Sequence, residues 1–204
     1  MTTHLFDSHT HCMDAPIGSA VINLPMSLLE HPELFRPDEG RLYSAGIHPL
    51  YDGDWEQALH GLHRMAARSQ LCAIGECGLD NRNRETLAGQ CSFFERQMLL
   101  ADRFCLPLIV HCVGCWDVLL RLNKLHPPKA PRMVHGFRGK PELASQLLSA
   151  GFDLSFGHRF NVRSYLLCPP ERRKIETDDT GLTIEMVTER QNELLRRAGS
   201  TGNH

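Results

Sequence analysis

The sequence has 204 residues, of which 42% are hydrophobic and 23% are charged, and its formal net charge is −2. These values are ordinary for a globular protein with a sizeable core, and they exclude the broad basic surface of a protein that binds long duplexes. No apolar run is long enough to span a bilayer, and no charged-then-apolar signal segment opens the chain. We therefore expect a single cytoplasmic domain over residues 1–204, without membrane contact.

Short apolar, β-rich segments recur along the chain, and helical stretches separate most of them. The segments are mostly continuous rather than alternating, as expected for parallel strands that are covered on both faces. The predicted strands are Leu5–His9, Ala20–Leu24, Leu42–Ile47, Leu71–Gly75, Leu108–His111, Arg132–His135, Phe152–Phe156 and Lys174–Thr177. The predicted helices, several with apolar residues near the 3.6-residue period, are Trp55–Ser69, Phe93–Phe104, Trp116–Leu125, Pro141–Ala150 and Thr183–Arg197.

The alternation of strands and helices predicts a parallel sheet, and eight strands predict a (β/α)8 TIM-type barrel. Such barrels usually have about 250 residues and a lower limit near about 200, so some connections must be abbreviated. Residues Cys12–Ser19 are too few for a helix between the first two strands, and Asn161–Pro170 allows one or two turns at most. A doubly wound open sheet is the alternative architecture.

Polar residues follow the predicted strands at corresponding places. His9 and His11 are two residues apart on the first strand, so their side chains point to the same side. Four further strands end at residues that can bind metal: Glu76, His111, His135 and Asp178. The carboxyl ends of the strands of a parallel barrel meet at one mouth, where active sites lie. Each residue alone has an ordinary structural interpretation, but their shared position predicts a metal centre.

The chemistry of this set of four histidines and two carboxylates suits zinc, manganese or another divalent ion rather than calcium. Six ligands are more than one tetrahedral ion with a bound water needs, so we expect two divalent ions (Zn, Mn or Mg). The two oxygens of Glu76 can face different ions, so this carboxylate can bridge them.

The motifs around these residues resemble those of the TatD family of metal-dependent hydrolases. The resemblance runs in order through Asp7–His11, Gly46–Pro49, Ile74–Asp80, Pro107–His111, Val134–Gly139 and Ile175–Asp178. It implies an amidohydrolase-type barrel in which His9, His11, Glu76 and Asp178 hold one ion and Glu76, His111 and His135 hold the other. It also implies hydrolysis of DNA, typically from 3′ to 5′ on single strands. The short connections and the segment Phe156–Phe160 depart from the family pattern and indicate a compact branch.

Several residues near the expected mouth are candidates for substrate contact. His48 ends the third strand and is predicted to touch substrate rather than metal. Four residues in the loops after the sixth and seventh strands can donate hydrogen bonds to a phosphate, either as a fork or as a point charge. They are Arg138, Lys140, His158 and Arg159. Solvated loop charges are the alternative for these four. Asp7 is expected to orient a histidine from the same strand.

The eight cysteines do not indicate a disulfide framework, because such frameworks belong to small secreted domains. Most of them lie in apolar or helix-like segments, as buried reduced thiols do. Cys112 and Cys115 have the C-x-x-C spacing of a redox pair or of half a zinc site, but no second C-x-x-C accompanies them. We therefore expect a structural role for this pair.

The predicted function is metal-assisted phosphodiester hydrolysis that trims single-stranded DNA or a nucleotide-like substrate, with Asp178 and Glu76 as catalytic residues. Phe137 and Phe160 lie beside the expected mouth and are predicted to stack on bases. Two alternatives remain: hydrolysis of a small ester, lactone or amide, and a metal-bound partner subunit of a larger complex with little turnover of its own.

Overall fold

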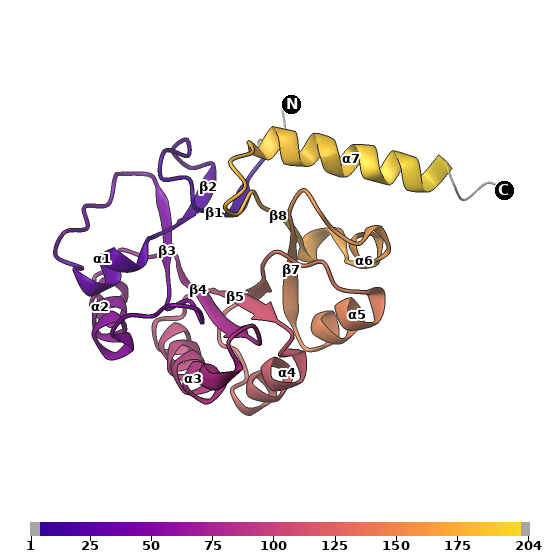
Figure 1. The fold of residues 1–204 in the computed structure, drawn as a ribbon. Coiled ribbons are helices and arrows are strands. Elements are labelled where there is room, and N and C mark those ends of the chain that lie inside the picture. Colours follow the sequence, from indigo (N-terminus) through magenta and orange to yellow (C-terminus); the bar gives the residue numbers. More distant parts are fainter. Residues whose placement is uncertain (1–4, 201–204) are drawn as a thin grey trace.

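The computed structural model describes residues 5–200, and its centre is a sheet of eight parallel strands in which sequence neighbours are spatial neighbours (Figure 1). A bridge between Thr10 and Asp178 joins the last strand to the first, which closes the sheet into a barrel. The predicted (β/α)8 architecture is confirmed, and the doubly wound alternative is wrong. The strands are β1 (Asp7–Thr10), β2 (Ala20–Asn23), β3 (Leu42–Ala45), β4 (Ala73–Asp80), β5 (Leu108–Val113), β6 (Arg132–Val134), β7 (Phe152–Phe156) and β8 (Arg173–Ile175).

Helices surround the barrel, and the longest predicted ones are found where the apolar period placed them. The connection from β1 to β2 contains no helix, and that from β7 to β8 holds only short ones, as predicted from their lengths. The sequence pattern did not predict the five-residue α1 or the first turns of α3. The α-helices are α1 (Met26–Glu30), α2 (Trp55–Ala67), α3 (Leu87–Phe104), α4 (Trp116–Leu125), α5 (Pro141–Ser149), α6 (Val162–Leu167) and α7 (Ile184–Ser200), and 3-10 turns occur at Arg84–Thr86 and Pro170–Arg172.

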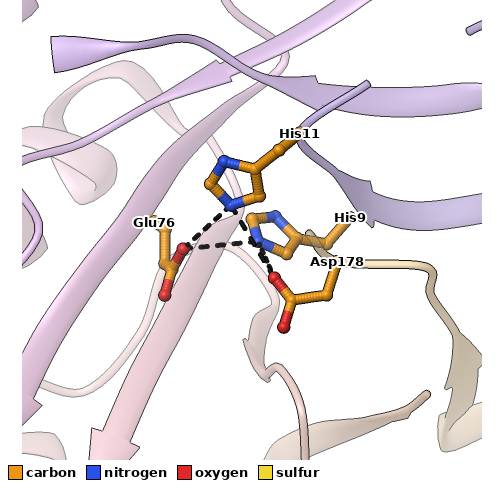
Figure 2. A group of neighbouring side chains, drawn as sticks. All are labelled: His9, His11, Glu76 and Asp178. Carbon is orange, nitrogen blue, oxygen red and sulfur yellow. Dashed lines mark ion pairs between the residues drawn. The ribbon is translucent and has the colours of Figure 1, made fainter. Parts of the chain in front are cut away.

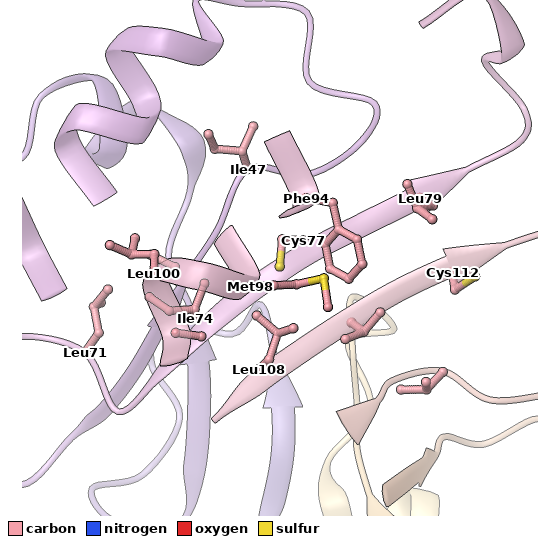
Figure 3. Packing of buried hydrophobic residues seen from close by; sticks show 14 of the residues in the cluster. Ile47, Leu71, Ile74, Cys77, Leu79, Phe94, Met98, Leu100, Leu108 and Cys112 are labelled. Carbon is pink, nitrogen blue, oxygen red and sulfur yellow. The ribbon is translucent and has the colours of Figure 1, made fainter. Parts of the chain in front are cut away.

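The helices are held on the barrel by local capping and by apolar packing. The side chain of Asp54 accepts the Gln57 N–H at 2.9 Å and so begins α2. Figure 3 shows the packing of α3 on β4 and β5, where Phe94 and Met98 are each 1% exposed. Burial of side chains of this size contributes about 1.5–3 kcal/mol each. This packing fixes the strands whose ends carry the polar residues.

The predicted end of β4 is wrong. The strand was expected to end at Gly75, but it continues to Asp80 and stays paired with β5. The pairing register shifts between Ile74 and Cys77, so Glu76 lies at an irregularity inside the strand. Such irregularities re-aim a side chain without ending the strand, and the sequence pattern of glycines around Glu76 resembled a strand end instead.

No helix within residues 5–200 combines the length and the apolar character that crossing a bilayer requires.

Candidate metal centre

His9 and His11 converge as the strand geometry predicts. Their Nε2 atoms each lie 3.4 Å from Oε2 of Glu76 and 3.8 and 3.7 Å from Oδ1 of Asp178, respectively. His9 is fully buried, whereas the side chain of His11 is 40% exposed at the mouth. Figure 2 shows the two rings and the two carboxylates pointing toward one another.

Glu76 lies at the centre of the cluster and presents its two oxygens to different neighbours. Oε2 faces His9 and His11, while Oε1 lies 2.7 Å from Nδ1 of His111 and 2.8 Å from Nε2 of His135. The close approach of β4 to β5 at this point requires glycine. A Cβ atom on Gly78, whose φ is +150°, would lie 2.0 Å from a backbone oxygen of β5.

Asp80 is a residue of the centre that the sequence did not predict. Its carboxylate is fully buried and lies 2.9 Å from Nε2 of His111, on the side of the ring away from Glu76. Arg82 donates from Nε to both oxygens of the same carboxylate at 2.9 Å. With its Nε2–H bound to Asp80, His111 directs the lone pair of Nδ1 into the cluster.

Glu176 plays a corresponding part for His135 and was also not predicted. It is 1% exposed, and its Oε1 accepts the N–H of Gly136 at 2.6 Å and lies 3.6 Å from Nδ1 of His135. The opposite ring nitrogen, Nε2, faces Glu76. Each of the two histidines from β5 and β6 therefore lies between Glu76 and a second buried carboxylate.

Asp178 is held at the seam where the barrel closes. Its N–H donates to the carbonyl of His9 at 3.0 Å, and its carbonyl accepts the N–H of His11 at 3.1 Å. Its φ of 55° lies in the left-handed region, which aspartate tolerates better than most residues. The backbone of the first strand therefore positions the carboxylate beside His9 and His11.

The expectation that Asp7 orients a histidine ring is wrong. Its carboxylate accepts the backbone N–H groups of His9 and Thr177 and the hydroxyl of Thr177, at 3.2, 3.1 and 2.6 Å. Asp7 sits low on a four-residue strand, and its short side chain reaches the main chain of the neighbouring segment. Its role is to join the two edges of the barrel.

The charges of the cluster are strongly coupled. Burial raises the pKa of Glu76, but the charge of His135 and contacts with His11 and His111 outweigh burial and hold that pKa far below its usual value. Burial lowers the pKa of His135, but Glu76 and Glu176 raise it well above its usual value. The carboxylates are therefore anionic, and their charge attracts a cation.

The pKa of Asp80 is also low. Burial raises it, but hydrogen bonds from Arg82 and then from His111 outweigh burial and lower the pKa to about 2. Asp80 is therefore ionised and can hold the Nε2–H of His111 with a charge-assisted hydrogen bond.

The residues fit divalent ions. Neither ring nitrogen of the buried His9 makes a hydrogen bond within residues 5–200. Buried polar atoms of this kind need a partner, and neutral imidazole nitrogens bind divalent metals. Ligand atoms gather within 4.8 Å of one another in three groups: His9, His11, Glu76 and Asp178; His48, Glu76 and His111; and His135, Glu176 and Asp178.

His48 reaches the cluster but in a form that suits hydrogen bonding. Its Nδ1 accepts the N–H of Leu50 at 3.1 Å, so the neutral ring carries its hydrogen on Nε2, which lies 3.3 Å from Oε1 of Glu76. A nitrogen that carries hydrogen cannot bind a metal, which agrees with the interpretation of His48 as a contact residue.

A cavity of about 710 Å³ opens above the cluster. Of the predicted substrate contacts, His48 and Arg138 line it, whereas His158 and Arg159 lie outside its wall. Trp116, the first residue of α4, is partly exposed on the wall.

The predicted stacking of bases on Phe137 is wrong. This ring is 1% exposed, because it packs edge-on against Trp116 and Phe156 at centroid distances of 6.1 and 6.0 Å. Phe160 is partly buried and packs on Phe156 and Tyr165. Trp116 is therefore the better-placed aromatic side chain for a base that enters the cavity.

The cysteines are free thiols, and Cys112 and Cys115 are both buried. Burial raises the pKa of both, and it raises the pKa of Cys72 to about 11. Thiols in this state are poor nucleophiles and poor metal ligands. The structural interpretation of the C-x-x-C pair is consistent with these environments.

The family model described as "TatD related DNase" matches residues 21–180. Among curated proteins, the "3'-5' ssDNA/RNA exonuclease TatD" of Klebsiella pneumoniae is 33% identical over 146 residues, which are 66% of this chain and 56% of that protein. The protein of the same name from Erwinia tasmaniensis is 37% identical over 113 residues, or 53% of this chain and 44% of that protein. The chain thus spans about half the length of these relatives.

Solved structures show the same fold at lower identity. YJJV, a TatD homologue from Escherichia coli K12, has a TM-score of 0.77 and 21% identity, and the match covers 95% of this chain and 91% of that chain. A TatD family hydrolase from Entamoeba histolytica has a TM-score of 0.63 and 19% identity, with 87% and 74% covered.

Proposed function

Because the chain belongs to the TatD related DNase family, we propose that it is a divalent-metal-dependent phosphodiesterase that trims single-stranded DNA from its 3′ end. The observation that carries this proposal is the convergence of His9, His11, Glu76 and Asp178 at the mouth of the barrel. The direction of trimming follows the printed names of the relatives, "3'-5' ssDNA/RNA exonuclease TatD". The whole chain is treated as one hydrolase domain.

We assign the residues to two ion sites that share Glu76. His9, His11 and Asp178 complete the first, and His111 and His135 complete the second. Support comes from the two carboxylate oxygens of Glu76, which face different histidines. Oε2 faces His9 and His11, and Oε1 faces His111 and His135. Asp80 holds the ring of His111 by a hydrogen bond of 2.9 Å, and the carboxylate of Glu176 lies 3.6 Å from Nδ1 of His135. Zn, Mn and Mg are all compatible with this nitrogen and oxygen set.

When bound, the ions supply a nucleophile from water near neutral pH and polarise the phosphoryl oxygen. The residues of the chain supply position and proton transfer. Asp178 lies at the open side of the cluster, with its side chain 25% exposed, where it can accept the proton of an attacking water. His48, with hydrogen on Nε2, can donate a hydrogen bond to a phosphate oxygen from the opposite wall.

The shape of the site favours a strand end over a duplex. The reacting residues lie at the bottom of a concave cavity, and a chain with net charge −2 offers no broad basic surface. A terminal nucleotide can enter such a cavity, whereas the middle of a duplex cannot.

The test is a gel assay of short single-stranded DNA, labelled at one end or the other, beside a covalently closed duplex circle, with Mn²⁺, Zn²⁺ or Mg²⁺ and with EDTA. We expect metal-dependent shortening from the 3′ end and little cutting of the circle. Glu76→Gln and Asp178→Asn should abolish shortening. The matched control is Asp153→Asn, because Asp153 pairs with Arg172 and Lys174 and lies outside the cluster and the cavity wall.

Three outcomes would overturn the proposal. Efficient cutting of the circle would show an endonuclease. Hydrolysis of a small ester or lactone without shortening of any oligonucleotide would show a different hydrolase. Tight binding of metal with no turnover of any of these substrates would favour a partner subunit.

A further inference from the structure

Arginine side chains without a partner gather on one side of the mouth. Arg138 follows β6 and lines the cavity, Arg159 follows β7, and Arg190 lies on α7. All three are exposed, and within residues 5–200 none of them makes an ion pair or a hydrogen bond. Most other arginines of the barrel are different. Arg82, for example, is held by Asp80, and Arg96 by Glu56.

Helix α7 is fixed to the mouth by side chains next to Arg190. The buried Gln191 donates from Nε2 to the carbonyls of Phe156 and Gly157 at 2.7 and 3.0 Å. These carbonyls belong to the end of β7, directly before His158 and Arg159. Val187, one turn earlier on the same face, is fully buried. Helix α7 therefore lies against the end of β7, next to the loop that carries Arg159, and Arg190 directly precedes Gln191 on this helix.

His158, the residue directly before Arg159, lies within the electrostatic reach of all three arginines. Burial lowers its pKa most, and the positive charges of Arg159, Arg138 and Arg190 lower it further, while Asp178 opposes them. One imidazole thus experiences the three guanidinium groups and a carboxylate of the candidate metal centre. The arginines form a cationic rim that begins at the cavity wall and continues onto α7.

We propose that Arg138, Arg159 and Arg190 form a binding track for the phosphates of single-stranded nucleic acid beyond the phosphate that is hydrolysed. This inference rests on the proposed function. Guanidinium groups bind phosphate oxygens with forked hydrogen bonds, and an unpaired guanidinium gives up no ion pair when it does so. In a chain with net charge −2, a local track of this kind is what a multiply charged strand requires.

Two of the three arginines of the track, Arg138 and Arg159, lie within the region that the family model matches, residues 21–180. The family model ends at residue 180, and α7 begins at Ile184, so Arg190 lies outside the match. The track would make the enzyme prefer an oligonucleotide over a dinucleotide, because a short substrate cannot reach the arginine on α7.

The experiment measures binding apart from cleavage. Fluorescence anisotropy of a labelled twelve-nucleotide single strand, in EDTA and at several salt concentrations, gives Kd and its salt slope for each protein. We expect the salt slope to fall by about 0.7 for each arginine changed to Gln, and by about 2 for the triple variant Arg138→Gln, Arg159→Gln, Arg190→Gln. Arg64→Gln is the control, since Arg64 lies in the last turn of α2, at the other end of the barrel, and is exposed.

A second measurement separates this inference from the proposed function. With Mn²⁺, shortening of the twelve-nucleotide strand should slow in Arg190→Gln relative to hydrolysis of a dinucleotide by the same variant, whereas both rates should be unchanged in Arg64→Gln. If the wild type shortens DNA but the triple variant binds the strand with the wild-type salt slope, the track is overturned and the proposed function stands. If the wild type shortens no DNA but binds it through the track, the proposed function fails alone. Equal binding of polyglutamate would show a general polyanion surface and would overturn the assignment to nucleic acid.

Discussion

Asp80→Asn tests how the second half of the metal centre is built. The substitution keeps the shape of the side chain but removes the negative charge that lies 2.9 Å from Nε2 of His111. His111 is then free to rotate or to change which ring nitrogen carries hydrogen. Because its Nδ1 faces Glu76 at 2.7 Å, either change removes a lone pair from the second ion site.

The expected magnitude follows from the contacts that are lost. A hydrogen bond to a charged group contributes about 1.5–3 kcal/mol, and loss of a residue that orients a metal-binding histidine lowers metal affinity by about 10–100-fold. The 10–100-fold loss of metal affinity corresponds to about 1.4–2.7 kcal/mol of binding free energy. The first ion site should be unaffected, because His9, His11 and Asp178 make no contact with Asp80.

The assay is calorimetric titration of the metal-free protein with Mn²⁺, in which the wild type should show two binding events. In Asp80→Asn, only the binding event of the second ion site should shift to lower affinity. Arg82→Gln is the matched control, since it removes the partner of Asp80 on the other side and leaves the contact with His111 in place. Unchanged binding at both sites, or an equal loss at both, would refute the role given to Asp80.

Three further predictions concern other parts of the chain. In the native protein, a thiol reagent should modify the exposed Cys12 and Cys105 quickly, the partly exposed Cys72 and Cys91 more slowly, and the buried cysteines only after unfolding. The buried ones are Cys77, Cys112, Cys115 and Cys168, and their fast modification would contradict the packing. Gly61→Ala should lower the free energy of unfolding by about 1–3 kcal/mol in a urea titration, since its Cβ would lie 1.7 Å from the carbonyl oxygen of Leu29. Trp116→Leu should weaken single-strand binding by about 1–3 kcal/mol of stacking energy, measured by anisotropy, and no change would show that bases do not reach this ring.

The positions of the candidate ligands were predictable because parallel strands place their carboxyl ends together. The two-residue period of a strand was enough to predict that His9 and His11 converge. The position of Asp178 directly after the last strand was enough to predict that it lies at the same mouth. The structure brings these three together with Glu76, as the sequence pattern indicated. Which ions they hold is a matter for the experiments above.

The supporting carboxylates were not predicted, because each resembles an ordinary residue in sequence. Asp80 followed what was taken for the end of β4, and Glu176 was taken for a residue inside β8. A signal was present in both cases. Asp80 is four residues after Glu76, so on a strand the two side chains lie on the same face. Glu176 is an acidic residue in a predicted strand, and a buried acid of this kind must have a polar partner. Trp116 opens the predicted helix Trp116–Leu125, and its position at the start of a helix did not by itself indicate that it lines a cavity.

Barrel closure and the placement of Asp178 depend on the same hydrogen bonds. Within residues 5–200, the pairing between the β1 and β8 edges is a single bridge from Thr10 to Asp178 rather than a ladder. The seam is joined instead by Asp7 and Thr10, which bind the hydroxyl of Thr177 at 2.6 and 2.8 Å, and by the backbone of Asp178. A cation held by His9 and Asp178 would link the same two edges, so its binding energy adds to the stability of the closed barrel. A compact chain with abbreviated connections can therefore depend on its metal for closure more than a barrel with a long final ladder does.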